Sequence, residues 1–327
     1  MKVVISDFIH DSLQPEKKIL GDLATVESLN GFAEAELWGR IDEADAIMMY
    51  HNLALTSKTI ERLKNCKLIV RCGVGIDNVD WKFARTQGIP VANVPDYGSE
   101  EVADTALGML LSLTRGISFL NQRLIRSQGE YSYSQVAPLR RLRGQTCGVI
   151  GVGRIGTAFV LRAKALNMRV VFYDPYVSDG VEKALGVERV NSLEELLQQS
   201  YAVSVHCPLT PETRHLINAQ TIELLPKGSF LVNTARGAIV DTTIIPQAIA
   251  SGRLAGAGID VLADEPPEPE NPLVLAWRDP QNPCHDRVIL NPHSAFYSEE
   301  GLTDMRVKGS QACRNALLGL PLRNVVN

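Results

Sequence analysis

Three polar side chains follow apolar, strand-like runs in the second half of the chain, and each has chemistry to offer. Arg236 follows the run SFLVNTA, Glu265 follows GAGIDV in the segment LADEPP, and His293 follows VILNP. Arginine holds carboxylates with a two-pronged guanidinium, histidine exchanges protons near neutral pH, and a glutamate on the second ring nitrogen orients an imidazole. Taken singly, each has an ordinary interpretation as well: a surface ion pair, a solvated acidic loop and a turn residue.

A glycine-rich turn precedes these residues in the chain. The motif Gly151-Val-Gly153-Arg-Ile-Gly156 directly follows the apolar run TCGVI and opens a helical stretch. In that context the glycines allow a tight turn, close approach to a pyrophosphate and close helix–strand packing, and the helix N-terminus attracts the phosphates. The motif therefore predicts a dinucleotide site, the alternative being a glycine-rich turn without a ligand.

The next strand, FYDP, ends in a carboxylate that bears on the choice of dinucleotide. Asp174 lies eighteen residues after Gly156, and no arginine immediately follows it. A carboxylate at this point accepts hydrogen bonds from ribose hydroxyls and repels a 2′-phosphate. We therefore predict NAD rather than NADP, while a capping aspartate is the ordinary interpretation.

In an open parallel sheet, ligands bind beyond the carboxyl ends of the strands. Arg236, Glu265 and His293 all occupy that position in the sheet that carries the glycine motif. Together they form a carboxylate clamp, a proton donor and an orienting group beside a nicotinamide. This set of groups is what hydride transfer to a 2-keto acid requires.

Two series of alternating strands and helices must position these groups. In the first series we expect a helix at 56–65, and strands at 2–6, 24–28, 44–50, 67–72 and 89–94. The second series has six expected strands, at 146–151, 169–174, 201–207, 229–235, 256–261 and 286–291. A long or slightly broken helix at 100–128 bridges the two series. A helix at 301–320 has no strand left to pair with in the second sheet and is expected to return to the first.

Composition narrows the classes of partner and compartment. The chain has 33 Lys and Arg against 37 Asp and Glu, a net charge of −4, which gives no argument for nucleic acid or an anionic membrane. The short basic cluster Arg140, Arg141 and Arg143 is interpreted as a solvated loop edge. The 6 scattered cysteines lack a C-x-x-C pair, and the N-terminus lacks a signal-peptide pattern, which favours a reducing, cytoplasmic setting without a metal site.

Several spaced motifs make the chain resemble a known family. GVIGVGRIG with FYDP, VNTARGAIVD, GIDVLADEPP and NPHSA together resemble the NAD-dependent D-isomer-specific 2-hydroxyacid dehydrogenases. Within that family, the segments MMYHNLALT and FYDPYVSDGVEKALGVERV are most similar to the branch of C-terminal-binding proteins. The resemblance covers nearly the whole chain.

The resemblance implies a fold and its boundaries. The fold class is α/β, with two doubly wound parallel-sheet domains, a Rossmann NAD-binding domain inserted into a flavodoxin-like substrate domain. The substrate domain is expected at 1–98 and 299–327, and the NAD-binding domain at 99–298. A homodimer built around the cofactor domains is also implied.

Roles for individual residues follow from the matched motifs. Arg236 would clamp the substrate carboxylate and carbonyl, His293 would protonate the carbonyl oxygen, and Glu265 would orient His293. Asp260 would hold the nicotinamide carboxamide. The full set of expected cofactor contacts is Gly151, Gly153, Arg154, Ile155, Gly156, Asp174, Cys207, Pro208, Thr234, Ala235 and Asp260.

The motif RCGVGIDNVD matches the substrate loop of the family. The backbone amides of Val74 and Gly75 would bind the substrate carboxylate, with Arg71 adding charge, although Arg71 could equally be an ion-pair partner. The loop residues Tyr50, His51, Tyr97 and Phe296 are expected to shape the pocket for the substrate side chain, although the tyrosines and His51 could equally serve loop packing. The binding-protein branch usually has tryptophan in place of Phe296, so the shape of that pocket, and the substrate, stay open.

Two functions are compatible with these motifs. The leading hypothesis is an NAD-dependent oxidoreductase that interconverts a D-2-hydroxy acid and its 2-keto acid. The alternative is an NADH-sensing binding or corepressor-type scaffold with residual dehydrogenase activity. The complete catalytic set and the absence of a basic surface favour the enzyme.

Overall fold

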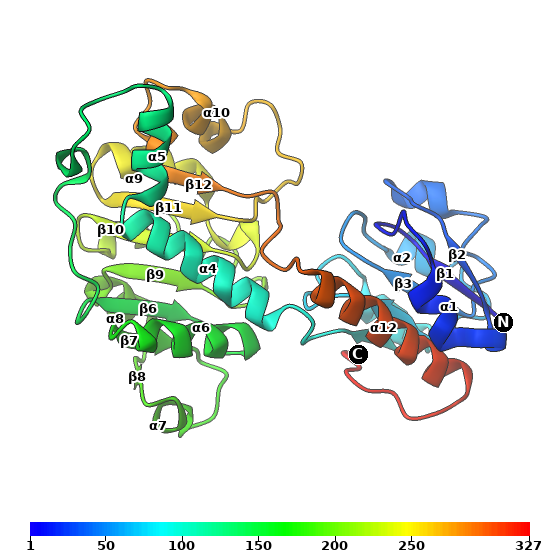
Figure 1. The fold of residues 1–327 in the computed structure, drawn as a ribbon. Helices are drawn as coiled ribbons and strands as arrows, with labels where there is room; N and C mark the ends of the chain where they lie inside the picture. The colour runs from blue at the N-terminus through cyan, green and yellow to red at the C-terminus, as the bar shows by residue number, and fades with distance from the viewer. The chain divides into compact units, whose positions relative to one another are not determined.

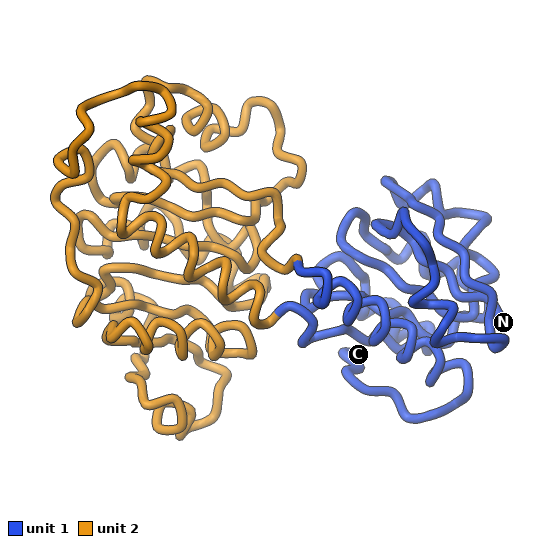
Figure 2. The backbone as a smooth tube through the Cα atoms, in the orientation of Figure 1, with its two compact units in different colours: residues 1–98, 298–327 blue, residues 99–297 orange.

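Two parallel sheets organise the chain. The computed structural model describes all of residues 1–327 and divides them into two compact units, unit 1 with residues 1–98 and 298–327, and unit 2 with residues 99–297 (Figures 1 and 2). Both sheets are flanked by helices, so the predicted α/β fold class is confirmed. No helix in the chain combines the length and apolar character that crossing a bilayer requires.

Unit 1 contains a five-stranded sheet in the order β2-β1-β3-β4-β5, all parallel. This is the flavodoxin-like order. Its strands are β1 Lys2–Ile5, β2 Thr25–Ser28, β3 Ala46–Met49, β4 Ile69–Arg71 and β5 Val91–Asn93. Its helices are α1 Gln14–Leu20, α2 Ser57–Ile60, α3 Trp81–Thr86 and α12 Glu299–Leu317.

Two helices of unit 1 bear on the predictions. The C-terminal helix returns to the first sheet as expected, because α12 packs on α1 and on strands β3 and β4. A buried ion pair holds this packing, with Arg306 Nε 2.6 Å from Glu16 Oε1. The expected helix at 56–65 is shorter than predicted, since α2 ends at Ile60 and the backbone amide of Lys64 bonds to Asp42 instead.

Unit 2 contains a seven-stranded parallel sheet in the order β12-β11-β10-β9-β6-β7-β8. Its strands are β6 Thr146–Ile150, β7 Arg169–Tyr173, β8 Glu188–Arg189, β9 Ala202–Val205, β10 Ser229–Asn233, β11 Leu254–Ile259 and β12 Val288–Leu290. Its helices are α4 Ser99–Thr114, α5 Ile117–Ile125, α6 Arg154–Ala165, α7 Val181–Leu185, α8 Leu193–Gln199, α9 Ile245–Ala250, α10 Pro272–Arg278 and α11 Cys284–Arg287.

One strand of unit 2 differs from the sequence-based expectation. The edge strand β8 is additional to the six predicted strands. It has only two residues, neither of them apolar, so the sequence has no alternation of apolar and polar residues there that would predict a strand. The helical stretch after residue 99, expected as one long or slightly broken helix, is broken into α4 and α5 at Gly116, whose φ is +66°. Strand order reverses at β6, which pairs with β7 on one side and β9 on the other, and a dinucleotide binds at such a switch point.

Candidate active site

The glycine-rich turn joins β6 to α6 at the carboxyl end of β6. Gly151 has a φ of +88°, and a Cβ there would lie 2.8 Å from the backbone nitrogen of Cys207. A Cβ on Gly156 would lie 2.0 Å from the carbonyl oxygen of Gly151. Both positions therefore exclude any larger residue. A Cβ on Gly153 would meet nothing within 4 Å, so this glycine, which precedes α6, leaves open space where a pyrophosphate can approach the backbone.

Asp174 follows β7 and lies beside this turn. Its Oδ2 accepts a hydrogen bond from the amide of Val152 at 3.0 Å, and its Oδ1 accepts one from the amide of Tyr176 at 3.0 Å. Sequence reasoning missed Arg189 on β8, whose guanidinium donates to the carbonyl oxygen of Asp174 at 3.1 Å and pairs with Asp179 at 3.2 Å. The short edge strand brings this arginine to the backbone carbonyl of Asp174 from fifteen residues away.

The remaining predicted cofactor residues also lie beyond the ends of strands in this sheet. They are Arg154 and Ile155 at the start of α6, Cys207 and Pro208 after β9, and Thr234 and Ala235 after β10. Burial raises the pKa of the Cys207 thiol to about 12, so it is a neutral lining group.

Two buried polar atoms at this edge have no hydrogen-bond partner in the protein, Thr234 Oγ1 and His206 Nδ1. His206, which sequence reasoning missed, directly follows β9, and its Nε2 is 2.8 Å from Ser204 Oγ. Burial lowers the pKa of His206 to about 3, which keeps its imidazole neutral. Because buried polar groups are almost always satisfied, unpartnered atoms at the edge with the open glycine turn fit a polar ligand such as a dinucleotide.

Glu265 and His293 form a direct pair at the ends of neighbouring strands β11 and β12. His293 Nδ1 lies 2.6 Å from Glu265 Oε2, and the side chains are 23% and 35% exposed, respectively. The amide of Leu262 donates to the other carboxylate oxygen at 2.8 Å, which fixes the carboxylate plane. Burial raises the pKa of Glu265, but the hydrogen bond and charge of His293, the Leu262 amide and the charge of Arg236 outweigh it, and the pKa is lowered overall. The pair is therefore an imidazole held by an ionised carboxylate.

The backbone around His293 is fixed by Asp260, at the end of β11. The His293 amide donates to the Asp260 carbonyl at 2.7 Å, and the amides of Ser294 and Ala295 donate to Asp260 Oδ1 at 2.9 and 3.1 Å. His293 itself has a φ of +50°, the left-handed conformation that this clamp holds. Asp260 is 1% exposed, and burial raises its pKa despite these bonds. The Asp260 carboxylate thus holds the loop that carries His293. The sequence did not predict this role; it predicted only a contact with the nicotinamide carboxamide.

Arg236 lies three residues beyond β10 in a turn shaped by Asn233. The Asn233 side chain accepts from the Ala235 amide at 3.0 Å and donates to the Arg236 carbonyl at 2.9 Å. Phe296 lies beside the acid–base pair, with its ring edge-on to His293 at a centroid distance of 6.0 Å. The sheet of unit 2 therefore gathers at one edge the glycine turn, Arg236, Glu265 and His293.

In unit 1, the predicted substrate residues lie at the carboxyl ends of β3 and β4. Arg71 ends β4, and its guanidinium folds over Gly73, where a Cβ would lie 1.6 Å from Arg71 Nη1. The turn that follows carries Val74, 37% exposed, and Gly75. Asn93 on β5 donates to the Val74 carbonyl at 2.7 Å and holds this turn.

Tyr50 occupies a different environment from the one expected. It is 0% exposed, its hydroxyl has no hydrogen-bond partner, and burial beside Cys72 and Glu16 raises its pKa. Its role in a substrate pocket stays a prediction. The half-buried ring of His51, which is expected from the sequence at the pocket, lies with its centroid 4.7 Å from that of Phe8. Phe8 is a further candidate at this edge that the sequence did not single out.

A comparison with known proteins bears on these groups. The family model for the NAD-binding domain of D-isomer-specific 2-hydroxyacid dehydrogenases matches residues 107–295. D-3-phosphoglycerate dehydrogenase of Methanocaldococcus jannaschii is 35% identical over 327 residues, which are 100% of this chain and 59% of that protein. C-terminal-binding protein 1 of Caenorhabditis elegans is 34% identical over 311 residues, 93% of this chain and 42% of that protein. The chain thus spans about half the length of these relatives.

Among solved structures, D-lactate dehydrogenase from Aquifex aeolicus, in complex with NAD and lactic acid, has a TM-score of 0.82 and 28% identity, covering 97% of this chain and 96% of that one. The TT0316 protein from Thermus thermophilus has a TM-score of 0.84 and 29% identity, covering 100% of both chains. The similarity therefore extends over both units of the fold.

Proposed function

The chain belongs to the D-isomer-specific 2-hydroxyacid dehydrogenase family, and on that premise we propose that it interconverts a D-2-hydroxy acid and its 2-keto acid. The observation that carries the proposal is the 2.6 Å pair of His293 Nδ1 and Glu265 Oε2, at the edge of the sheet that holds the glycine turn. The match to an NAD-binding domain supports a nicotinamide dinucleotide as cofactor.

The residues of the dinucleotide site divide the work of binding. Gly151, Gly153 and Gly156, with Arg154 and Ile155, receive the pyrophosphate at the start of α6. Asp174 receives the adenosine ribose, and its negative charge favours NAD over NADP. When bound, the nicotinamide supplies the hydride in reduction and accepts it in oxidation.

The acid–base step falls to His293. Because Glu265 holds Nδ1, proton exchange with the substrate belongs to Nε2. In reduction, Nε2 gives its proton to the carbonyl oxygen as C2 receives the hydride, and the negative charge of Glu265 stabilises the imidazolium that this step starts from. Arg236 binds the substrate carboxylate and polarises the carbonyl. Within unit 1, Arg71 and the amides of Val74 and Gly75 are the proposed anion-binding group of the substrate domain.

The test of this function is the rate of NADH oxidation, followed by absorbance, with each of a panel of 2-keto acids. Turnover of at least about 1 per second with one acid is expected, since typical enzymes lie between about 1 and 1000 per second. If the chain binds NADH but no acid gives turnover above about 0.1 per second, the function is wrong. The alternative, an NADH-sensing scaffold, rests on the similarity to C-terminal-binding protein 1. NADH binding without turnover would favour this alternative.

Assembly and location complete the proposal. We propose a homodimer through unit 2, supported by exposed apolar side chains on and after α5: Ile117, Leu124, Ile125, Tyr131 and Tyr133. We propose a cytoplasmic location, supported by six free thiols, of which Cys72, Cys147, Cys284 and Cys313 are buried.

A further inference from the structure

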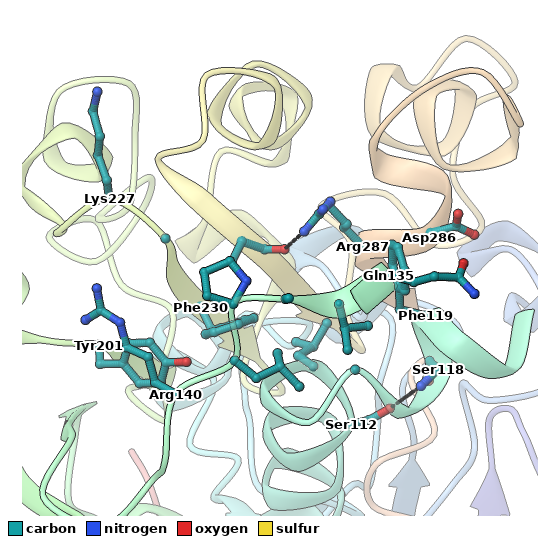
Figure 3. A pocket seen from close by; sticks show the side chains of 18 residues that line it. Ser112, Ser118, Phe119, Gln135, Arg140, Tyr201, Lys227, Phe230, Asp286 and Arg287 are labelled. Carbon is teal, nitrogen blue, oxygen red and sulfur yellow. Dashed lines mark hydrogen bonds between the residues drawn. The ribbon is translucent and has the colours of Figure 1, made fainter. Parts of the chain in front are cut away.

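The cavity shown in Figure 3 gives no separate ligand site. It is lined in unit 2 by residues between 112 and 140 and by the starts of neighbouring strands. These residues flank the exposed apolar side chains through which the homodimer is proposed, so the cavity belongs to that contact. In unit 1, by contrast, two polar side chains, Asp7 and Asn78, hold the loop of residues 50–53, which follows β3 at the carboxyl edge of the sheet.

Asp7 binds backbone amides of this loop. The aspartate follows β1 and is 0% exposed. Its Oδ1 accepts hydrogen bonds from the Ser6 hydroxyl at 2.6 Å and from the Tyr50 amide at 2.8 Å, and its Oδ2 accepts one from the Asn52 amide at 2.8 Å. Burying a carboxylate is costly unless donors compensate it, and two of these three donors are amides of one loop. Asp7 therefore fixes the loop to the end of β1.

Asn78 binds backbone carbonyls of the same loop. Its Nδ2 donates to the carbonyl oxygens of Tyr50 and Leu53, both at 2.8 Å. Its Oδ1 accepts a hydrogen bond from Arg71 Nε at 3.3 Å. The backbone of Asn78 is itself fixed, because the Leu55 amide donates to its carbonyl oxygen at 2.9 Å. One side chain thus joins the loop after β3 to the arginine that ends β4.

The groups held in this way are those expected at the substrate pocket. Phe8, next to Asp7, has a φ of +70°, and its ring centroid lies 5.3 Å from that of Tyr50 and 4.7 Å from that of His51. A bulky residue with positive φ is strained and persists only where its surroundings hold it. Arg71 is 6% exposed, so its side chain is also held in one place. The edge of unit 1 is therefore ordered before any ligand binds.

We propose that Asp7 and Asn78 are positioning residues of the substrate site, which hold loop 50–53 and Arg71 in the geometry that binds the 2-keto acid. The proposal rests on the function proposed above. Displacing a binding group by about 1 Å can cost about 100-fold in rate, and side chains that are already ordered lose little entropy on binding. Both residues lie in unit 1 and the glycine turn lies in unit 2, so their loss should impair use of the keto acid and spare the dinucleotide.

Steady-state kinetics of the full chain test the role of Asp7. Asp7→Asn leaves a single acceptor oxygen, so its NH2 group must face the amide of either Tyr50 or Asn52. We expect KM for the best keto acid to rise at least about tenfold, while KM for NADH stays within about twofold of the native value. A native KM for the keto acid in this variant, folded by circular dichroism, would overturn the proposal.

A matched control separates positioning from a general loss of stability. Asp45 Oδ2 accepts a hydrogen bond from the Lys2 amide at 2.7 Å, at the opposite edge of the same sheet. Asp45→Asn therefore disturbs a similar carboxylate–amide bond far from the loop. It should keep both KM values within about twofold of the native values, even where the melting temperature falls. A rise in the keto acid KM equal to that of Asp7→Asn would contradict a specific role for Asp7.

Asn78→Asp distinguishes the two contacts of Asn78. The carboxylate still accepts from Arg71 Nε, but its second oxygen faces the carbonyl oxygens of Tyr50 and Leu53 in place of a donor. We expect the keto acid KM to rise at least about tenfold although the contact with Arg71 is kept. A native KM in this variant would show that the loop needs no such support and would overturn the proposal.

Amide hydrogen exchange over a peptide covering residues 49–55 tests the loop without turnover. Exchange should be slow in the native chain and in Asp45→Asn, and at least about tenfold faster in Asp7→Asn and Asn78→Asp. If a variant is unfolded, the native chain still decides, because complete exchange of this peptide within seconds would overturn the proposal. A native chain that shows the expected exchange but reduces no keto acid would refute the proposed function while leaving the ordered loop standing, so the two failures are distinguishable.

Discussion

Replacing Glu265 with glutamine tests the proposed acid–base pair most directly. The amide has nearly the shape of the carboxylate and can keep the bond from the Leu262 amide, but it removes the negative charge that lies 2.6 Å from His293 Nδ1. A hydrogen bond to a charged group contributes about 1.5–3 kcal/mol. Because the two side chains are 23% and 35% exposed, solvent screens the pair, and we take about 2 kcal/mol, in the lower half of that range.

That free energy corresponds to a fall of about 30-fold in kcat, since about 1.4 kcal/mol is a factor of ten. The loss should be expressed in the reduction direction, because that direction needs the imidazolium. The assay is the initial rate of NADH oxidation with the best keto acid between pH 6 and 9, with kcat and KM determined separately. NADH affinity should stay within about threefold of the native value, because Glu265 lies outside the dinucleotide turn.

Two further variants bracket the result. Glu265→Asp keeps the charge but shortens the side chain, so it should retain more activity than glutamine does. His293→Ala removes the proton donor and should lower kcat by a factor on the order of 100 or more with NADH affinity near normal. A Glu265→Gln loss below about threefold would refute the assigned role of the carboxylate.

Two predictions concern the dinucleotide edge. Asp174→Ala should lower the ratio of kcat/KM for NADH to kcat/KM for NADPH by about tenfold, because the carboxylate that repels the 2′-phosphate is gone. A native chain that already prefers NADPH would contradict this role of Asp174. Burial lowers the pKa of His206 from 6.5 to about 3, so the imidazole stays neutral in the folded chain and takes up a proton when the chain unfolds. His206 therefore has no effect on the free energy of unfolding above pH 6.5, and it lowers that free energy progressively as the pH falls toward 3. Between pH 6.5 and 5 the free energy of unfolding should fall by about 2 kcal/mol because of His206. Urea titrations should show a smaller fall in His206→Gln and an unchanged fall in the exposed control His10→Gln. Equal acid sensitivity in the two variants would show that His206 is not the group responsible.

The sequence alone determined the elements and the types of chemistry. Strand runs and helical spacing are local patterns, so the order of elements, the α/β class and the glycine turn that opens α6 could all be predicted without a structure. The position of Arg236, Glu265 and His293 beyond strands also followed, because parallel strands present their carboxyl ends at a common edge. The family resemblance, carried by motifs of that kind, is confirmed by the match over residues 107–295.

Tertiary structure decided which side chains meet. The bond between Glu265 and His293 joins residues 28 positions apart, and the clamp of Asp260 on Ser294 joins residues 34 positions apart. No local pattern encodes such distances, since they depend on how neighbouring strands align and how the loops between them close. For the same reason, the full burial of Tyr50 could not be anticipated, because its environment is assembled from segments far apart in the chain.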